Sequence, residues 1–183
     1  YKRQSKPSTK PKRLRIGYFS ADLIEHPVAY LIAKVFKKHN RENFEIYGYS
    51  INSRQEDRLR ERLVKSFDIF NDVQDFSDKD AALLARQDQI DIAIDLTGYM
   101  FNSRPGIFAY RAAPIQISYL GYPGTMGADF IDYLIADEVL IPPSLQQNYS
   151  EKIIFLPNSY MATDNTLDIA KATPSRSDLG LPK

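Results

Sequence analysis

The chain has 183 residues and a formal net charge of +1, and 43% of its residues are hydrophobic and 26% charged. This length and balance indicate one globular domain and exclude an intrinsically disordered chain. The sequence contains neither the run of about 18 apolar residues that a membrane span needs nor the apolar segment of a signal peptide. Cysteine is absent, which excludes disulfides, thiolate metal sites and cysteine nucleophiles. Its absence fits a reducing compartment, so we expect a cytoplasmic protein.

The charges are unevenly distributed. Residues 1–15 carry seven Lys and Arg side chains and no acid, whereas the remaining 168 residues hold 17 basic and 23 acidic side chains. This acidic remainder is a poor candidate for binding a nucleic-acid backbone. We interpret residues 1–13 as a basic linker, with contact to an anionic partner as the alternative. Residues 14–159 are predicted to form the folded domain, and residues 160–183 a connector toward a further domain.

Strands and helices alternate along the predicted domain. Short apolar runs predict strands, and apolar residues at i, i+3, i+4 and i+7 predict helices. In chain order we expect a strand at 14–19, a helix at 28–39, a strand at 44–50, a helix at 54–67, a strand at 69–70, a helix at 77–87, a strand at 90–96, a helix at 105–111, and strands at 114–120, 133–136 and 152–156. The order predicts an α/β fold with a Rossmann-like, mostly parallel sheet and helices on both faces.

Two loops at the carboxyl ends of the predicted strands carry candidate site residues, because ligands of such sheets bind at that edge. In the first loop, His26 stands directly before Pro27 and a helix. There it could act as a general base kept neutral by the helix N-terminus, or simply cap the helix. The second loop contains Gly98, Tyr99 and Arg104. The arginine could hold an anion or anchor the loop.

A third loop is rich in glycine. Three glycines spaced by three would let the backbone approach a ligand closely, although a plain turn explains them equally well. The loop matches neither G-x-G-x-x-G nor a P-loop. With two histidines and no cysteine, we expect no metal site. The candidate residues of this loop are Gly121, Tyr122, Pro123, Gly124 and Thr125.

Five stretches of the sequence carry a resemblance to a known family. They read LRIGYFSADLIEHPVAYL, FEIYGYS, IDIAIDLTGY, RAAPIQISYLGYPGTMGADFIDYLIAD and YSEKIIFLP. With them the chain resembles, from Leu14 to Pro157, the amino-terminal half of the catalytic region of O-GlcNAc transferases, glycosyltransferase family 41. The resemblance implies the GT-B architecture, in which two Rossmann-like halves face each other across a cleft.

The resemblance also implies an activity. The intact protein would be an inverting enzyme that transfers N-acetylglucosamine from UDP-GlcNAc to Ser or Thr hydroxyls of proteins, without a cofactor or metal. The carboxy-terminal half would bind most of the donor, while this half would line the acceptor side and be inactive alone. Tetratricopeptide repeats would precede it, and neither nucleic acid nor membrane would be a partner. His26 would be catalytic, and substrate contacts would come from Pro27, Gly98, Tyr99, Arg104 and residues 121–125.

The sequence departs from the family pattern at three places. Leu23 stands where many bacterial members have Phe, Tyr99 where many have His, and Arg86 where the animal enzyme has His. These departures keep two alternatives open: a transferase of the same architecture with another sugar or acceptor, and a degenerate, non-catalytic interaction module. The identity of the catalytic base also stays open, since water or the donor phosphate could accept the proton.

Overall fold

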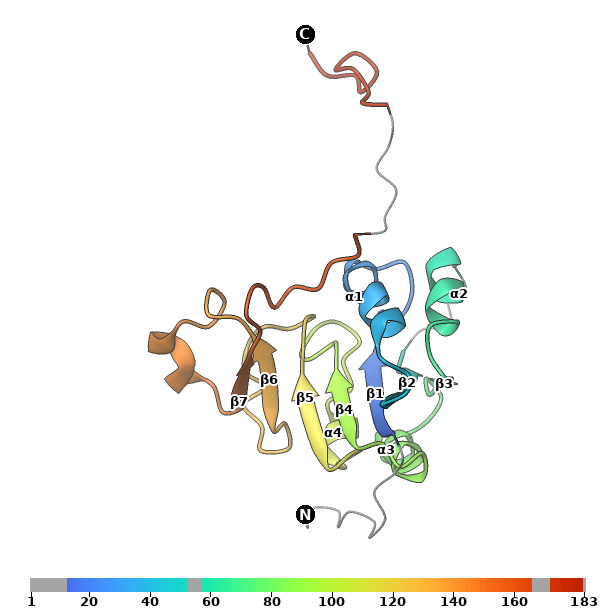
Figure 1. Ribbon diagram of the computed structural model, residues 1–183, viewed down its shortest axis with the longest axis vertical. Helices are drawn as coiled ribbons and strands as arrows, with labels where there is room; N and C mark the ends of the chain where they lie inside the picture. The colour runs from blue at the N-terminus through green and yellow to red at the C-terminus, as the bar shows by residue number, and fades with distance from the viewer. Residues whose placement is uncertain (1–12, 53–56, 166–171, 183) are drawn as a thin grey trace.

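A computed structural model of the chain describes residues 13–52, 57–165 and 172–182 (Figure 1). Its centre is a seven-stranded sheet in the order β3-β2-β1-β4-β5-β6-β7, in which every neighbouring pair is parallel. This arrangement confirms the predicted Rossmann-like α/β class. The strands are β1 (Leu14–Ser20), β2 (Phe44–Ser50), β3 (Ile69–Asp72), β4 (Ile92–Asp95), β5 (Ile115–Ser118), β6 (Tyr133–Ala136) and β7 (Lys152–Phe155).

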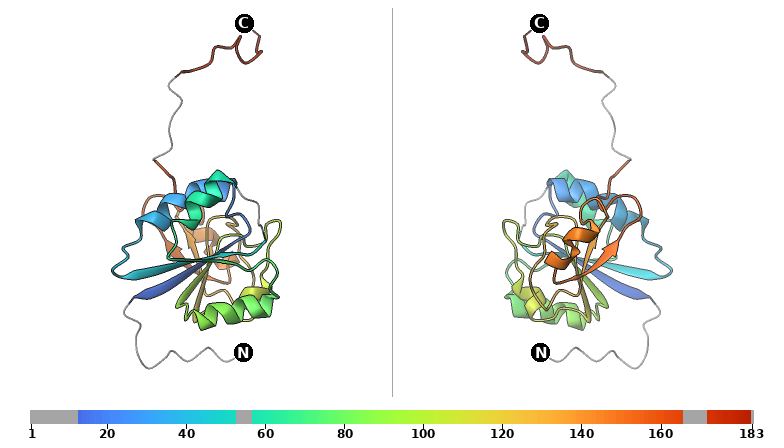
Figure 2. Two further views of the ribbon diagram at one scale, coloured as in Figure 1. Left: turned by 90° about the vertical axis from the view of Figure 1, so that its right-hand side faces the viewer. Right: turned by 90° about the vertical axis from the view of Figure 1, so that its left-hand side faces the viewer.

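Helices cover both faces of the sheet (Figure 2). On one face, α1 (Pro27–Lys38) and α2 (Arg58–Val64) pack against alternate residues of β1, β2 and β4. On the other face, α3 (Asp78–Gln87) and α4 (Gly106–Ala109) pack against the residues in between. Fully burying a Leu, Ile or Phe side chain stabilises a fold by about 1.5–3 kcal/mol. Burial on both faces explains why the central strands are almost continuously apolar.

The strand order reverses between β1 and β4, the two central strands. The chain leaves β1 toward α1 on one face and leaves β4 toward α4 on the other. Loops that diverge in this way leave a crevice at the carboxyl ends of the strands, where ligands of doubly wound sheets bind. The loop after β5 emerges at the same edge, so the fold places all three predicted loops there.

Three local predictions differ from the structure. The helix expected at 54–67 begins at Arg58, because the Asp57 side chain caps it by accepting the Arg60 N–H at 2.7 Å; residues 53–56 lie outside the described part. Helix α4 is shorter than predicted, and Pro105 stands at its N-cap rather than inside its first turn. The short 3₁₀ helix η1 (Pro143–Asn148) was not predicted, although Pro fits the first position of a helix.

The first residues of the predicted connector pack onto the domain. The Tyr160 N–H donates to Asp137 Oδ2 at 2.7 Å, and the Tyr119 hydroxyl donates to the Tyr160 carbonyl at 2.7 Å. Of the predicted linker, residues 1–12 lie outside the described part, and Arg13 pairs with Glu45. Among the described residues, no helix combines the length and the apolar character needed to cross a membrane.

Candidate functional site

The structure brings the three predicted loops into contact at the carboxyl edge of the sheet. The first and second loops are joined where the Ala21 N–H donates to Thr97 Oγ1 at 3.0 Å. The second and third are joined where the Tyr99 hydroxyl donates to the Met126 carbonyl at 2.8 Å. The rings of Tyr99 and Tyr122 also meet edge to face, with centroids 5.7 Å apart. The three loops therefore form one braced surface.

His26 caps helix α1. Its Nδ1 accepts the Val28 N–H at 3.3 Å, and its side chain is 37% exposed. A neutral imidazole that accepts a hydrogen bond at Nδ1 carries its proton on Nε2. The remaining nitrogen is then a hydrogen-bond donor and not a base. A role as general base would require the proton on Nδ1 and the loss of the cap.

Asp22 is the only other polar partner of the His26 ring among the described residues. One of its carboxylate oxygens, Oδ2, lies 3.7 Å from His26 Nδ1, which is too long for a hydrogen bond. Burial raises the pKa of Asp22, and a positive charge on His26 opposes that rise. Asp22 was not among the predicted site residues; its position four residues before the histidine was the available signal.

The turn at Gly98 is built on a buried carboxylate. Asp95 Oδ1, at the end of β4, accepts the N–H groups of Thr97 at 2.9 Å and Gly98 at 3.0 Å. Burial raises the pKa of Asp95 to about 6, although these two hydrogen bonds favour the charged form. Gly98 has a φ of +57°, and a Cβ there would lie 2.4 Å from the Tyr122 Cβ. Only glycine fits this point of contact between two loops.

The third loop is held in place by Glu151, which sequence reasoning missed. Its buried carboxylate accepts the Met126 N–H at 2.6 Å through Oε1 and the Thr125 hydroxyl at 2.7 Å through Oε2. At the other end of the loop, a Cβ on Gly121 would lie 2.0 Å from the Leu96 carbonyl oxygen. The loop is therefore fixed at both ends, which suits a surface that positions a ligand. The signal for Glu151 in the sequence is the YSEK stretch, which belongs to the motifs that carry the family resemblance.

Two roles are predicted for Arg104, holding an anion or anchoring the loop, and its contacts in the structure are those of an anchor. Its Nε donates to Asp78 Oδ1 at 2.8 Å, and Nη1 donates to the carbonyls of Ile51 and Val73 at 3.1 and 2.9 Å. Its Nη2 donates to the carbonyl of Phe76 at 2.6 Å. The guanidinium thus joins the second loop to the ends of β2 and β3, and little of it remains for an anion.

The side of the site that a ligand can reach consists mainly of aromatic, proline and glycine residues. Tyr99 is 49% exposed, and Phe101, which was not predicted as a site residue, is 87% exposed. Pro27 and Pro123 are exposed as well, and Gly124 is half-buried beside the Tyr122 ring. Within the described ranges, no group of three or more His, Asp or Glu side chains could hold a metal ion. The exposed rings can therefore pack on a ligand.

A parallel sheet with braced loops at the carboxyl ends of its central strands defines a Rossmann-like domain, a class of fold in which ligands bind at that edge. Comparison with known proteins identifies the particular family. The family model described as Glycosyl transferase family 41 matches residues 1–173, and the chain belongs to this family.

Similar proteins carry consistent names. The chain is 43% identical over 178 residues to the probable UDP-N-acetylglucosamine–peptide N-acetylglucosaminyltransferase SEC of Arabidopsis thaliana, covering 94% of this chain and 18% of the relative. It is 36% identical over 155 residues to the UDP-N-acetylglucosamine–peptide N-acetylglucosaminyltransferase of Caenorhabditis elegans, covering 84% of this chain and 14% of that protein. A solved Thermobaculum terrenum O-GlcNAc transferase mutant matches with a TM-score of 0.85 at 34% identity, over 94% of this chain and 34% of its own. The chain thus spans only 14–18% of the length of these two curated relatives.

Proposed function

We propose that these residues form the amino-terminal Rossmann-like half of a GT-B catalytic region, in a protein that transfers N-acetylglucosamine from UDP-GlcNAc to Ser or Thr hydroxyls of proteins. Family membership and the names of the relatives support this activity. The observation that carries the proposal is the structural match to an O-GlcNAc transferase mutant at a TM-score of 0.85. The braced loops would line the acceptor side of the cleft, and this half would be inactive alone.

Transfer requires an oxygen nucleophile, a leaving diphosphate and a destination for one proton. The acceptor hydroxyl oxygen forms a bond to the anomeric carbon, the bond between that carbon and the UDP oxygen breaks, and UDP leaves with the electron pair. The loops at 98–99 and 121–125 would hold the acceptor in line with that bond, which is the main contribution of a preorganised site. The exposed aromatic ring of Tyr99 and the close backbone approach at Gly124 are the means available.

His26 would act as a catalytic hydrogen-bond donor through Nε2. The Val28 N–H at its Nδ1 supports this assignment, since it fixes the proton on the other nitrogen. A donor beside the reacting oxygens stabilises the charge that develops on them. The proton of the acceptor hydroxyl would then go to water or to a donor phosphate oxygen.

The partners of the protein follow the same proposal. The donor would bind mainly to a carboxy-terminal half, tetratricopeptide repeats would precede this domain, and the protein would act in the cytoplasm. The reaction would need neither metal nor cofactor, and neither nucleic acid nor membrane would be a partner. Transfer that stops on addition of a chelator and resumes with a divalent cation would contradict the metal-free reaction.

The test is transfer of radiolabelled N-acetylglucosamine from UDP-GlcNAc to a serine-containing acceptor peptide by the full-length protein. We expect labelled peptide, with His26→Asn reducing the rate and Lys79→Gln, on the exposed side of α3, leaving it unchanged. If the peptide is labelled faster from another UDP-sugar than from UDP-GlcNAc, that other sugar nucleotide is the donor. Absence of both transfer and sugar-nucleotide hydrolysis would instead indicate a non-catalytic interaction module.

A further inference from the structure

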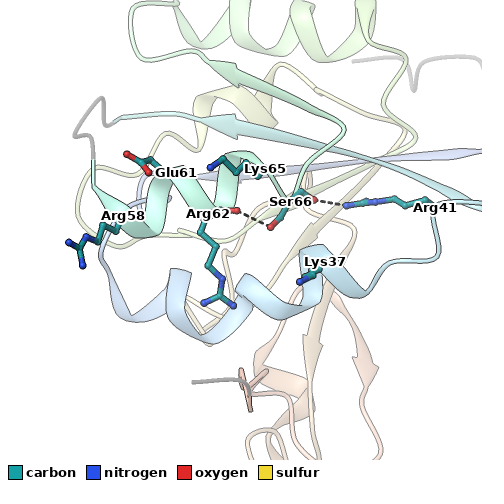
Figure 3. A pocket seen from close by; sticks show the side chains of 7 residues that line it. All are labelled: Lys37, Arg41, Arg58, Glu61, Arg62, Lys65 and Ser66. Carbon is teal, nitrogen blue, oxygen red and sulfur yellow. Dashed lines mark hydrogen bonds between the residues drawn. The ribbon is translucent and has the colours of Figure 1, made fainter. Parts of the chain in front are cut away.

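A basic groove lies between α1 and α2 (Figure 3). Its volume is about 570 Å³, and Arg58 stands at one end of it and Arg41 at the other. Among the described residues that line the groove, five carry a positive charge and one a negative charge, although the part of the chain beyond residue 15 carries more acid than base. The charged side chains of the groove are Lys37, Arg41, Arg58, Glu61, Arg62 and Lys65.

Two of the five cations are used by the fold. The Arg41 guanidinium pairs with Asp68 at 3.3 Å and donates to the Ser66 and Phe36 carbonyls, so it holds the ends of the two helices together. Arg62 forms an ion pair with Asp164.

The other three, Lys37, Arg58 and Lys65, are exposed and have no ion-pair partner within the described ranges. Three unpaired cations facing one groove repel each other. That arrangement is stabilised when an anion binds.

One cation of the groove, Arg62, already binds a carboxylate. Asp164 lies on the segment that follows β7, and its side chain is fully buried where it meets Arg62. The planar guanidinium group of arginine matches the geometry of a carboxylate. A carboxylate therefore pairs better with arginine than with the compact ammonium group of lysine. The Arg62–Asp164 pair therefore shows that a cation of this groove binds a carboxylate brought to it by a distant part of the chain.

The Arg58 end of the groove adjoins the His26 loop. Asp57, which caps α2, accepts the Glu25 N–H through Oδ2 at 2.8 Å, and Glu25 is the residue before His26. An extended polypeptide that leaves the candidate acceptor site past His26 therefore meets Arg58 first. Lys37 and Lys65 follow toward the other end of the helices.

We propose that this groove docks an acidic segment of the protein acceptor, next to the hydroxyl that receives the sugar; the inference rests on the proposed function. Carboxylates at intervals along the segment pair with Arg58, Lys37 and Lys65, as Asp164 pairs with Arg62. A nucleic acid fits less well, because none of the described residues that line the groove is aromatic and could stack on a base, and the rest of the domain is net acidic.

The first experiment measures binding without any transfer. A fluorescein-labelled octapeptide of alternating Glu and Ser is titrated with the full-length protein, and fluorescence anisotropy gives the affinity. We expect the double variant Lys37→Glu/Lys65→Glu to bind at least about tenfold more weakly, and rising salt to weaken binding to the parent protein. The control Lys79→Glu/Lys152→Glu makes the same charge change outside the groove and retains the parent affinity.

Equal affinity of the groove and control variants for this octapeptide overturns the proposal. So does tighter groove-dependent binding of an RNA octanucleotide than of the peptide. Both lysines are exposed, and Lys37→Gln/Lys65→Gln serves as a milder pair if the reversal lowers the melting temperature. This pair must also weaken peptide binding if the groove is the site.

The second experiment separates this proposal from the proposed function. The full-length protein is given two acceptor peptides that differ only in having Glu or Gln beside the serine. The groove variant is expected to raise KM for the Glu peptide by about tenfold and to leave the Gln peptide unchanged. An equal effect on both peptides overturns the groove proposal. Absence of transfer by the parent protein overturns the proposed function instead, and the binding experiment then decides whether the groove binds acidic peptides.

Discussion

Replacing His26 separates its structural role from its proposed role in transfer. His26→Ala removes both the helix cap and the imidazole. His26→Asn removes the imidazole but offers an amide oxygen to the Val28 N–H, and the extended backbone at position 26, with φ −141° and ψ 147°, suits Asn as an N-cap. The pair of variants therefore distinguishes a capping residue from a functional one.

The loss of stability expected for His26→Ala follows from the geometry of the cap. An N-cap contributes about 0.5–2 kcal/mol, and the long 3.3 Å bond and 37% exposure of this side chain indicate the lower half of that range. We therefore expect His26→Ala to lower the free energy of unfolding by about 0.5–1 kcal/mol, or the melting temperature by roughly 1–4 °C. His26→Asn should stay within about 1 °C of the parent protein. Thermal and urea unfolding measure both.

Transfer by the full-length protein supplies the second readout. If His26 acts as a donor to the reacting oxygens, both variants lose at least about tenfold in kcat, even though only one of them is destabilised. Normal transfer by His26→Asn would reduce the residue to a cap. If His26→Asn unfolded as readily as His26→Ala, the cap assignment, and with it the tautomer, would be refuted.

Three further changes test the surroundings of the site. Glu151→Gln should destabilise the protein by about 1.5–3 kcal/mol in urea unfolding, because an amide satisfies only one of the two donors that the buried carboxylate accepts. Gly121→Ala should cost about 2–4 kcal/mol, because its Cβ would meet backbone 2.0 Å away. Asp95 has a raised pKa of about 6, so its folded form binds more protons than the unfolded chain between about pH 4 and 6. The free energy of unfolding should therefore increase as the pH falls through this window, by at most roughly 3 kcal/mol, and Asp95→Asn should remove this increase.

Matched variants control each change. Glu138 is exposed, so Glu138→Gln should leave stability unchanged; an equal loss there would contradict the role given to Glu151. Gly127 has a φ of +59° but open space around it, so Gly127→Ala should cost only about 1–2 kcal/mol of backbone strain. If the difference in the free energy of unfolding between Asp95→Asn and the parent protein is the same at pH 7 and pH 5, the assigned pKa is refuted.

The sheet could be predicted because its pattern is local. Each buried strand is a short apolar run, and the α1 stripe repeats with helical spacing, so the alternation of strands and helices followed directly. Element ends were less accurate, since a single capping side chain such as Asp57 decides where a helix begins. The 3₁₀ helix at 143–148 was missed because it carries no apolar stripe.

The site could be predicted only as far as its loops. Their position at the carboxyl ends of strands follows from the fold class, and His26 and Gly98 stood out by residue type. Glu151 and Asp95 did not, because each acts on backbone groups that only the folded chain brings within reach. Arg104 was ambiguous for the same reason, since its partners at Ile51, Val73 and Phe76 lie far away in sequence.

The cross-links between the three loops have a consequence for protein engineering. Thr97 holds the first loop and Tyr99 the third, and both side chains contact backbone groups, so the second loop supplies the side chains that shape its two neighbours. A chimaera that imports a second loop without these two side chains would therefore lose bonds in both loops that were kept. Changing the ligand preference of this scaffold requires keeping Thr97 and Tyr99 when the second loop is exchanged, and the carboxylate of Glu151 when the third is exchanged.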